Sequence, residues 1–188
     1  GVITGYYQGI DQYRGTAVIT NSGTVTHTAS YGYAIRIAYG TITNSGMASL
    51  IAGGIDVEDG TAVVTNQGTI TASAYGAAVN LRYGGTVTNS GAASLIQGGV
   101  FVYGPDPGIV TNQGTIAGTY GFSVGVGSGG TVTNSGLILA SSNGSTGVGL
   151  YGRSVLSNSG TIRSGGHGVY LDGAGSVTNT GLIQAGNI

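Results

Sequence analysis

The stretch VTNQGTITAS at residues 64–73 decides the fold, because the chain repeats it with only small changes. An asparagine followed two residues later by a glycine occurs eight times, at intervals of 21 to 24 residues. A turn motif at a fixed interval is the signature of a repeat architecture in which each unit stacks on the next. The eight pairs are Asn21/Gly23, Asn44/Gly46, Asn66/Gly68, Asn89/Gly91, Asn112/Gly114, Asn134/Gly136, Asn158/Gly160 and Asn179/Gly181.

A second period of 45 residues lies on top of the first. Gly1, Gly46, Gly91, Gly136 and Gly181 are each 45 residues apart. Similar segments occur at this spacing: IDQYRGTAVITN at 10–21 matches IDVEDGTAVVTN at 55–66, and TNSGMASLIAGG at 43–54 matches TNSGAASLIQGG at 88–99. The repeat unit therefore comprises two coils of alternating type.

Each coil carries three short segments with the alternation of a half-buried strand. One ends at the asparagine, one follows the glycine, and a third holds two apolar residues separated by one position. No window shows a helical pattern of apolar residues. The third-segment pairs are Ile35/Ile37, Ile55/Val57, Val79/Leu81, Val100/Val102, Val124/Val126, Val148/Leu150 and Val169/Leu171.

Three strands per coil at one fixed phase predict a parallel β-solenoid. An antiparallel meander would need alternating hairpin turns and would not keep one residue type at one phase. Because parallel crossovers are overwhelmingly right-handed, we predict an all-β, right-handed parallel β-helix. About eight coils, stacked at ~4.8 Å, would make residues 1–188 a single rod-like repeat domain roughly 40 Å long.

The recurring asparagine and glycine are expected to serve this geometry. A sharp corner favours a residue that tolerates left-handed backbone conformation, as asparagine does, and the glycine would cover a second strained position. Stacked asparagines can also hydrogen-bond to one another along the rod. The 16 corner residues are therefore predicted to be structural.

Composition limits the classes of partner. The 188 residues include 40 glycines and no cysteine, and Lys+Arg is 5 against 6 for Asp+Glu, which gives a net charge of −1. All five basic residues are arginines. This balance argues against nucleic-acid binding, which requires a basic surface. No apolar run approaches 18 residues, so no membrane-spanning helix is expected, and neither a signal peptide nor a cofactor motif is visible.

Asp56, Glu58 and Asp59 form the densest group of charges. If Ile55 and Val57 point inward, Asp56 and Glu58 point outward on one strand. Paired carboxylates can cleave polysaccharides or bind Ca²⁺, but no lysine or arginine cluster accompanies these acids in the sequence. We therefore expect a solvated outer face that offers Asp56 and Glu58 as candidate contact residues.

Other motifs do not predict catalytic or metal-binding residues. GVGSGG at 125–130 has dinucleotide-motif spacing, but a strand pattern follows it where a helix would be needed to hold phosphate. GGHGVYLDG at 165–173 has Tyr170 where the calcium-binding nonapeptide has aspartate. His27 and His167 are about six coils apart and cannot share a metal ion, and no serine has a histidine and an aspartate at matching coil positions.

Aromatic residues are the stronger candidates for surface contact. Tyr31, Tyr75 and Tyr120 recur in every second coil, and Phe101 and Tyr103 replace the acids at the equivalent position two coils on. Stacked tyrosines can simply pack on the surface of a rod. Exposed aromatic rings also suit contact with sugars or proteins.

Rows of Thr-x-Thr form another surface pattern, at 41–43, 86–88 and 131–133, and are continued by SVT at 176–178. Flat threonine arrays on a β-solenoid resemble those of ice-binding proteins. Here the alternate coils carry valine or isoleucine at one of the two positions, and we expect no continuous threonine lattice. Threonine is also a favourable strand residue in its own right.

The motif TVTNSG followed by GTI, with later GVYLDG or GVGLYG, resembles the β-helical passenger domains of proteobacterial autotransporters and related surface adhesins. The resemblance covers the whole chain. It implies export, display at the bacterial surface or release, and contact with host or cell-surface proteins or glycans. The translocator barrel of that family is absent from this sequence.

Both ends of the sequence look like the middle of a coil, and repeat rods usually need capping units. Two roles are therefore predicted: a segment of an extracellular adhesive rod, or a subunit that stacks end to end into a filament. A carbohydrate-active enzyme and an ice-binding solenoid are the less favoured alternatives.

Overall fold

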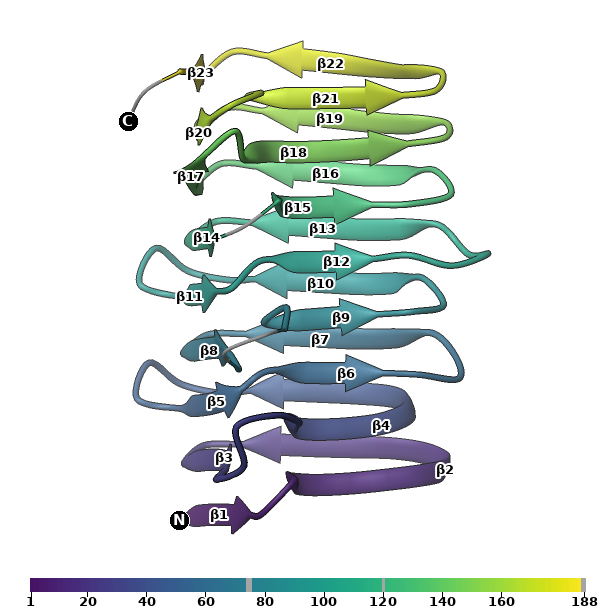
Figure 1. The fold of residues 1–188 in the computed structure, drawn as a ribbon, viewed down its shortest axis with the longest axis vertical. Helices are drawn as coiled ribbons and strands as arrows, with labels where there is room; N and C mark the ends of the chain where they lie inside the picture. The colour runs from purple at the N-terminus through teal and green to yellow at the C-terminus, as the bar shows by residue number, and fades with distance from the viewer. Residues whose placement is uncertain (74–75, 120, 187–188) are drawn as a thin grey trace.

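The computed structural model of the chain describes residues 1–73, 76–119 and 121–186. It is a parallel β-solenoid in which the chain climbs through successive coils around one axis (Figure 1). In the successive coils one strand runs to the right in front and the next returns to the left behind, as the chain ascends from N to C. The solenoid is therefore right-handed, as predicted.

Three flat faces bound the rod. Face 1 is a nine-stranded parallel sheet, and faces 2 and 3 are joined into a 14-stranded sheet by the two long strands β2 (Gln8–Asn21) and β4 (Tyr33–Asn44). Face 1 comprises β1 (Val2–Gly5), β3 (Thr24–His27), β5 (Leu50–Gly53), β8 (Thr69–Ala72), β11 (Leu95–Gln97), β14 (Thr115–Gly118), β17 (Leu137–Asn143), β20 (Thr161–Gly165) and β23 (Leu182–Ala185).

The other two faces contribute one strand each to every later coil. Face 2 comprises β6 (Ile55–Val57), β9 (Val79–Leu81), β12 (Val100–Val102), β15 (Phe122–Val126), β18 (Thr146–Tyr151) and β21 (Val169–Asp172). Face 3 comprises β7 (Ala62–Asn66), β10 (Gly85–Asn89), β13 (Gly108–Asn112), β16 (Gly130–Asn134), β19 (Ser154–Asn158) and β22 (Gly175–Asn179). In the first two coils β2 and β4 continue round the corner between these faces, so those coils depart from the three separate strands that we predicted.

The interior is a column of aliphatic side chains supplied by all three faces. Each middle coil buries one residue from face 1, the predicted pair from face 2 and one residue from face 3; Ile70, Val79, Leu81 and Val87 make one such layer, each 0% exposed. Fully burying an aliphatic side chain contributes about 1.5–3 kcal/mol. The inward pairs predicted for face 2 are confirmed as core from Ile35 through Leu150.

The corner between faces 3 and 1 is held by a continuous ladder of asparagine side chains. Each Nδ2 donates to the Oδ1 of the asparagine one coil further on, at 2.7–2.8 Å, in seven consecutive steps from Asn21 to Asn179. The five asparagines from Asn44 to Asn134 are fully buried. Backbone carbonyls of the same and the next coil accept further bonds from Nδ2, so the buried amides are well satisfied.

Of the two reasons predicted for the asparagine, the hydrogen-bonded ladder is confirmed and the left-handed backbone conformation was wrong. None of the eight asparagines has a positive φ, and Ser128 is the one non-glycine residue among the described ranges that does. The asparagines end strands with ordinary backbone conformation. They stabilise the corner through the hydrogen bonds of their amide side chains and not through a left-handed backbone conformation.

The predicted reason for the corner glycine holds at only two of the eight positions. Gly46 and Gly91 have φ of 89° and 91°, where a side chain would strain the backbone. At the other six the prediction of a strained position was wrong, because none of them has a positive φ. These six are Gly23, Gly68, Gly114, Gly136, Gly160 and Gly181.

Close stacking of coils explains the six glycines that backbone conformation does not. At each of them the space for a Cβ is taken by the coil before. A Cβ at Gly23 would meet the backbone of Gly1, one at Gly68 would meet Ser49, and one at Gly160 would meet the carbonyl oxygen of Gly136. These corners therefore require glycine because successive coils approach one another too closely for a side chain.

From Asn44 to Asn112, wide and tight asparagine corners alternate and produce the two-coil period of that part of the rod. Residues 45–49 and 90–94 form wide corners, whereas residues 67–68 and 113–114 form tight ones. Gln67 and Gln113 in the tight corners reach back one coil, and the Oε1 of each accepts from the backbone N–H of Gly46 or Gly91 at 3.2 Å. Asn-Gln-Gly thus marks a tight corner that follows a wide one, whereas Asn-Ser-Gly occurs at both kinds of corner, since the corner after Asn134 is also tight.

Candidate functional site

The outward side of face 2 carries the most varied side chains of the rod. The residue between each inward pair points outward, and parallel pairing stacks these residues in one row. From the N-terminal end the row reads Asp11, Arg36, Asp56, Asn80, Phe101, Gly125, Gly149 and Tyr170. Charged residues occupy the first half of the row, and aromatic and glycine residues occupy the second.

The first half contains a charged cluster of Arg36, Asp56, Glu58 and Arg82. The Arg82 guanidinium donates from Nε and Nη2 to the two carboxylate oxygens of Asp56, at 3.1 and 2.8 Å. Asn80 Nδ2 donates to the same carboxylate at 2.7 Å. Arg36 Nη2 donates to Glu58 Oε2 at 2.5 Å, and Arg82 lies 3.6 Å from the other oxygen of Glu58.

Two sequence expectations about this cluster were wrong. Asp56 is only 1% exposed, because Arg82 and Asn80 cover it, so it does not belong to a solvated surface. The acids are also accompanied by arginines, which come from the coils before and after. Arg36 and Arg82 are distant in sequence from Asp56 and Glu58, yet the stacking of coils brings them into contact.

The electrostatics of the cluster differ between its two acids. Burial raises the pKa of Asp56, and the hydrogen bonds from Arg82 and Asn80 oppose that rise. Burial also raises the pKa of Glu58, but the hydrogen bond from Arg36 and the interactions with Asp56 and Arg82 outweigh that effect. The pKa of Glu58 is therefore below its usual value. Because both carboxylates are engaged by arginine, the arrangement favours a structural ion-pair network over acid–base chemistry.

The second half of face 2 carries an aromatic platform of Phe101, Tyr103, Phe122, Tyr151 and Tyr170. The rings of Phe101 and Tyr103 are 5.8 Å apart with an interplanar angle of 12°. Phe122 contacts Tyr151 edge to face at 6.0 Å, and Tyr151 lies 6.2 Å from Tyr170. Burial raises the pKa of Tyr103 to about 12.

Glycines beside the rings leave the space that this platform occupies against the sheet. A Cβ at Gly125 would lie 2.8 Å from the hydroxyl of Tyr103 and 2.9 Å from the ring of Phe101. A Cβ at Gly127 would meet the Tyr103 ring at 2.9 Å, and one at Gly149 would meet the Phe122 ring at 2.5 Å. Glycine weakens a strand interior and often marks the close approach of another group; here that group is an aromatic ring.

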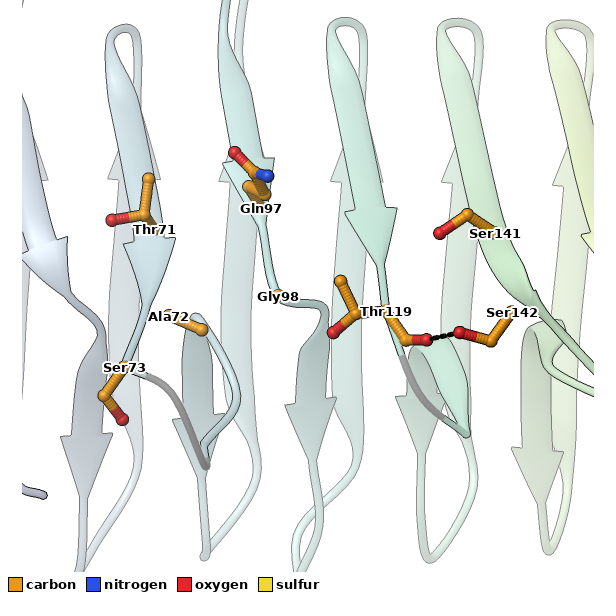
Figure 2. Close-up of a pocket in the computed structure, with 8 residues that line it drawn as sticks. All are labelled: Thr71, Ala72, Ser73, Gln97, Gly98, Thr119, Ser141 and Ser142. Atoms are coloured by element: carbon orange, nitrogen blue, oxygen red, sulfur yellow. Dashed lines mark hydrogen bonds between the residues drawn. The ribbon is translucent and has the colours of Figure 1, made fainter. Parts of the chain in front are cut away.

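A polar groove adjoins the platform at the corner between faces 1 and 2. It holds about 480 Å³ and crosses four consecutive coils (Figure 2). Hydroxyl and amide side chains form most of its lining, and Ser142 Oγ donates to the carbonyl oxygen of Thr119 across it. The lining residues are Thr71, Ala72, Ser73, Gln97, Gly98, Thr119, Ser141 and Ser142.

Gly98 and Gly99 alone link β11 to β12 at this corner. The chain then enters the platform directly: Phe101 follows Gly98 by three residues, and Phe122 follows Thr119 by three. The groove and the platform therefore lie on the same coils.

The predicted contact residues are distributed along the rod. Phe101 and Tyr103 lie together in the platform, and Asp56 and Glu58 lie together in the charged cluster. Tyr31 lies near the N-terminal end, 61% exposed, with its ring 5.6 Å from that of Tyr7. Tyr75 and Tyr120 lie outside the described residues.

Sequence reasoning missed Arg36, Arg82, Phe122, Tyr151 and Tyr170 as members of these clusters. For Arg36 and Tyr170 the signal was available, because each lies between the two apolar residues of an inward pair. Aligning those pairs would have placed them in the outward row. Within the described ranges no group of three histidine or acidic residues is placed to hold a metal ion, and no helix is long and apolar enough to span a bilayer.

Comparisons with protein-family models, with curated proteins and with solved structures gave no match for this chain.

Proposed function

We propose that this chain is a structural and adhesive rod displayed outside a bacterial cell, and that it contacts carbohydrate through the aromatic platform and the adjoining groove. The extracellular location follows from the likeness of the corner motif to autotransporter passenger domains. The solenoid supports separate roles for its two sets of residues. The inward residues repeat from coil to coil and stabilise the fold, whereas the outward residues of face 2 change and are available for specific contacts.

One observation carries the carbohydrate proposal: the stacked rings of Phe101 and Tyr103 lie over Gly125 and Gly127, whose missing side chains leave room for them. An accessible aromatic ring can pack against the C–H face of a sugar ring, as aromatic side chains do in many apolar contacts. Threonine, serine and glutamine side chains in the groove can hydrogen-bond to sugar hydroxyls. A protein partner would instead require about 800 Å² of well-packed surface on each side.

The test is binding to an array of bacterial and host glycans, with the double variant Phe101→Ala/Tyr103→Ala. We expect the parent to bind at least one class of glycan and the double variant to lose that binding. Ile109→Ala is the matched control, because Ile109 is an exposed apolar residue one strand along the chain, on face 3. Absence of glycan binding by the parent, or full binding by the double variant, would contradict the proposal.

Two alternatives have their own signatures. Electron microscopy that shows long filaments of purified protein would favour a filament subunit, and single short rods at high concentration would exclude it. Release of reducing sugar from a polysaccharide, lost on Glu58→Gln, would show an enzyme.

A further inference from the structure

Face 3 differs from the other two faces in its outward side chains. Two outward rows follow its strands, and the pairing is in register from β2 to β22 without a shift on this face. The first row reads Val18, Thr41, Val63, Thr86, Ile109, Thr131, Val155 and Ser176. The second reads Thr20, Thr43, Thr65, Thr88, Thr111, Thr133, Ser157 and Thr178.

This arrangement, called the β-branched face below, is more regular than the sequence suggested. The second row bears a hydroxyl at every one of its eight positions. In the first row threonine alternates with valine or isoleucine, but valine and threonine have nearly the same shape. The interruption expected from the sequence is therefore a loss of hydroxyl groups in the first row alone. It changes the outline of the surface little where valine replaces threonine, and more at Ile109 and Ser176.

Strand propensity does not account for the β-branched face. Threonine, valine and isoleucine are favoured in all strands, so propensity alone would place them on all three outward surfaces. Face 1 instead carries Leu50, Leu95, Gln97, Leu139 and Arg163 among its outward residues. Face 2 carries the charged cluster and the aromatic platform. Only face 3 restricts its two outward rows to β-branched residues and serine, and these rows hold no charge and no aromatic ring.

The repeat distances of the face suit an ordered layer of water. Neighbouring positions in a row are separated by ~4.8 Å along the rod, and the two rows by about 6.6 Å along each strand. Both distances are close to oxygen repeats in hexagonal ice. Hydroxyl groups at fixed spacing can hydrogen-bond to bound water, and the methyl groups between them restrict the orientation of water without bonding to it.

We propose that the β-branched face binds the surface of ice. A second copy of the chain is the other candidate occupant, but the face is too small for it. Two rows over eight coils measure roughly 34 by 10 Å, or about 340 Å², against about 800 Å² on each partner of a stable interface. A dry interface would also remove water from the row of hydroxyls, and unpaired hydroxyls are costly to bury. An ice surface keeps those hydroxyls bonded to water.

The experiment measures thermal hysteresis and ice-crystal shape with the purified chain, with serum albumin at equal mass concentration as the blank. We expect faceted crystals and a freezing-point gap above the blank. Thr111→Lys should abolish both, because a long charged side chain would stand in the middle of the face. Thr115→Lys is the matched control: it makes the same change in the adjoining strand β14, on face 1, at a residue of similar half-buried character.

Two conservative variants separate surface shape from damage to the fold. Thr111→Val keeps the outline and should retain most of the activity, because valine already alternates with threonine in the first row. The platform variant Phe101→Ala/Tyr103→Ala should leave ice binding unchanged, so the ice proposal and the carbohydrate proposal fail independently. A gap no larger than that of albumin overturns the inference, as does equal activity in Thr111→Lys and Thr115→Lys when both have the circular dichroism of the parent.

Discussion

Replacing one asparagine in the middle of the ladder tests how much the corner contributes to stability. Asn89 is 0% exposed, its Nδ2 donates to Asn112 Oδ1 at 2.8 Å and to the carbonyl oxygen of Thr115 at 3.1 Å, and its Oδ1 accepts from Asn66 at 2.8 Å. Asn89→Ala removes these three bonds, together with a longer and weaker one from Nδ2 to the carbonyl oxygen of Ser94 at 3.4 Å, and leaves the side-chain oxygen of Asn112 buried without its donor.

The magnitude follows from these contacts. A buried acceptor left without a partner costs about 1–3 kcal/mol, and each of the other two bonds contributes about 1 kcal/mol. The expected loss is therefore about 3–5 kcal/mol. This is a large part of the 5–15 kcal/mol typical of folded proteins, and it should lower a urea midpoint by roughly 2 M at an m-value of about 2 kcal/mol/M.

Asn179→Ala is the control at the end of the same ladder. Asn179 accepts from Asn158 at 2.7 Å but is exposed, so water can replace the lost bond and the loss should stay below about 1 kcal/mol. Urea unfolding followed by circular dichroism measures both variants, and equal m-values show that the same transition is compared. Equal losses in the two variants, or less than about 1 kcal/mol for Asn89→Ala, would refute the ladder as a source of stability.

Three further predictions follow from the corners and from face 2. Gly114→Ala should destabilise more than Gly91→Ala in urea unfolding, because a Cβ at Gly114 would lie 2.3 Å from a backbone oxygen whereas Gly91 has free space and only its φ of 91° to strain; the reverse order would contradict the packing argument. Arg82→Ala should cost more stability at pH 7 than at pH 4, because the mutation removes a pairing with the ionised carboxylate of Asp56 that protonation of Asp56 weakens in the parent as well; a loss independent of pH would exclude that cause. Since the pKa of Tyr103 is raised from 10.0 to about 12, the stability that this phenol contributes is complete below pH 10 and is lost as the pH rises toward 12; Tyr103→Phe should therefore unfold less readily at high pH, and an unchanged alkaline transition would argue against it.

The sequence alone predicted the inward half of this molecule well. A parallel solenoid stacks each residue on its equivalent in the next coil. The sequence interval between Asn66, Asn89 and Asn112 therefore also gives the register in which their strands pair. The same logic places Val79 and Leu81 in the core, because the inward positions of every coil face the same column and accept the same kind of side chain.

The outward half was harder to predict because it depends on side-chain direction. Asp56 lies in a strand whose outward residues would ordinarily be solvated, and it is buried because Arg82 and Asn80 cover it from the next coil. Phe101 could be placed on face 2 from the sequence, but the position of its ring depends on the missing side chain of Gly125. Such contacts join neighbouring coils but do not recur from coil to coil, so the repeat pattern of the sequence does not reveal them.

The exchange between wide and tight corners has a consequence for how the chain finds its native alignment. Nearly identical coils invite a slip in which one coil pairs with the wrong neighbour, and such slips are a characteristic failure of repeat proteins during folding. After a slip of one coil, Gln67 would face another tight corner and lose the exposed N–H of Gly46 that it binds natively. The bonds of Gln67 and Gln113 therefore favour the native order of coils over an order shifted by one coil. Only a shift of two coils would again place a glutamine, Gln113, beside a wide corner, that of Gly46.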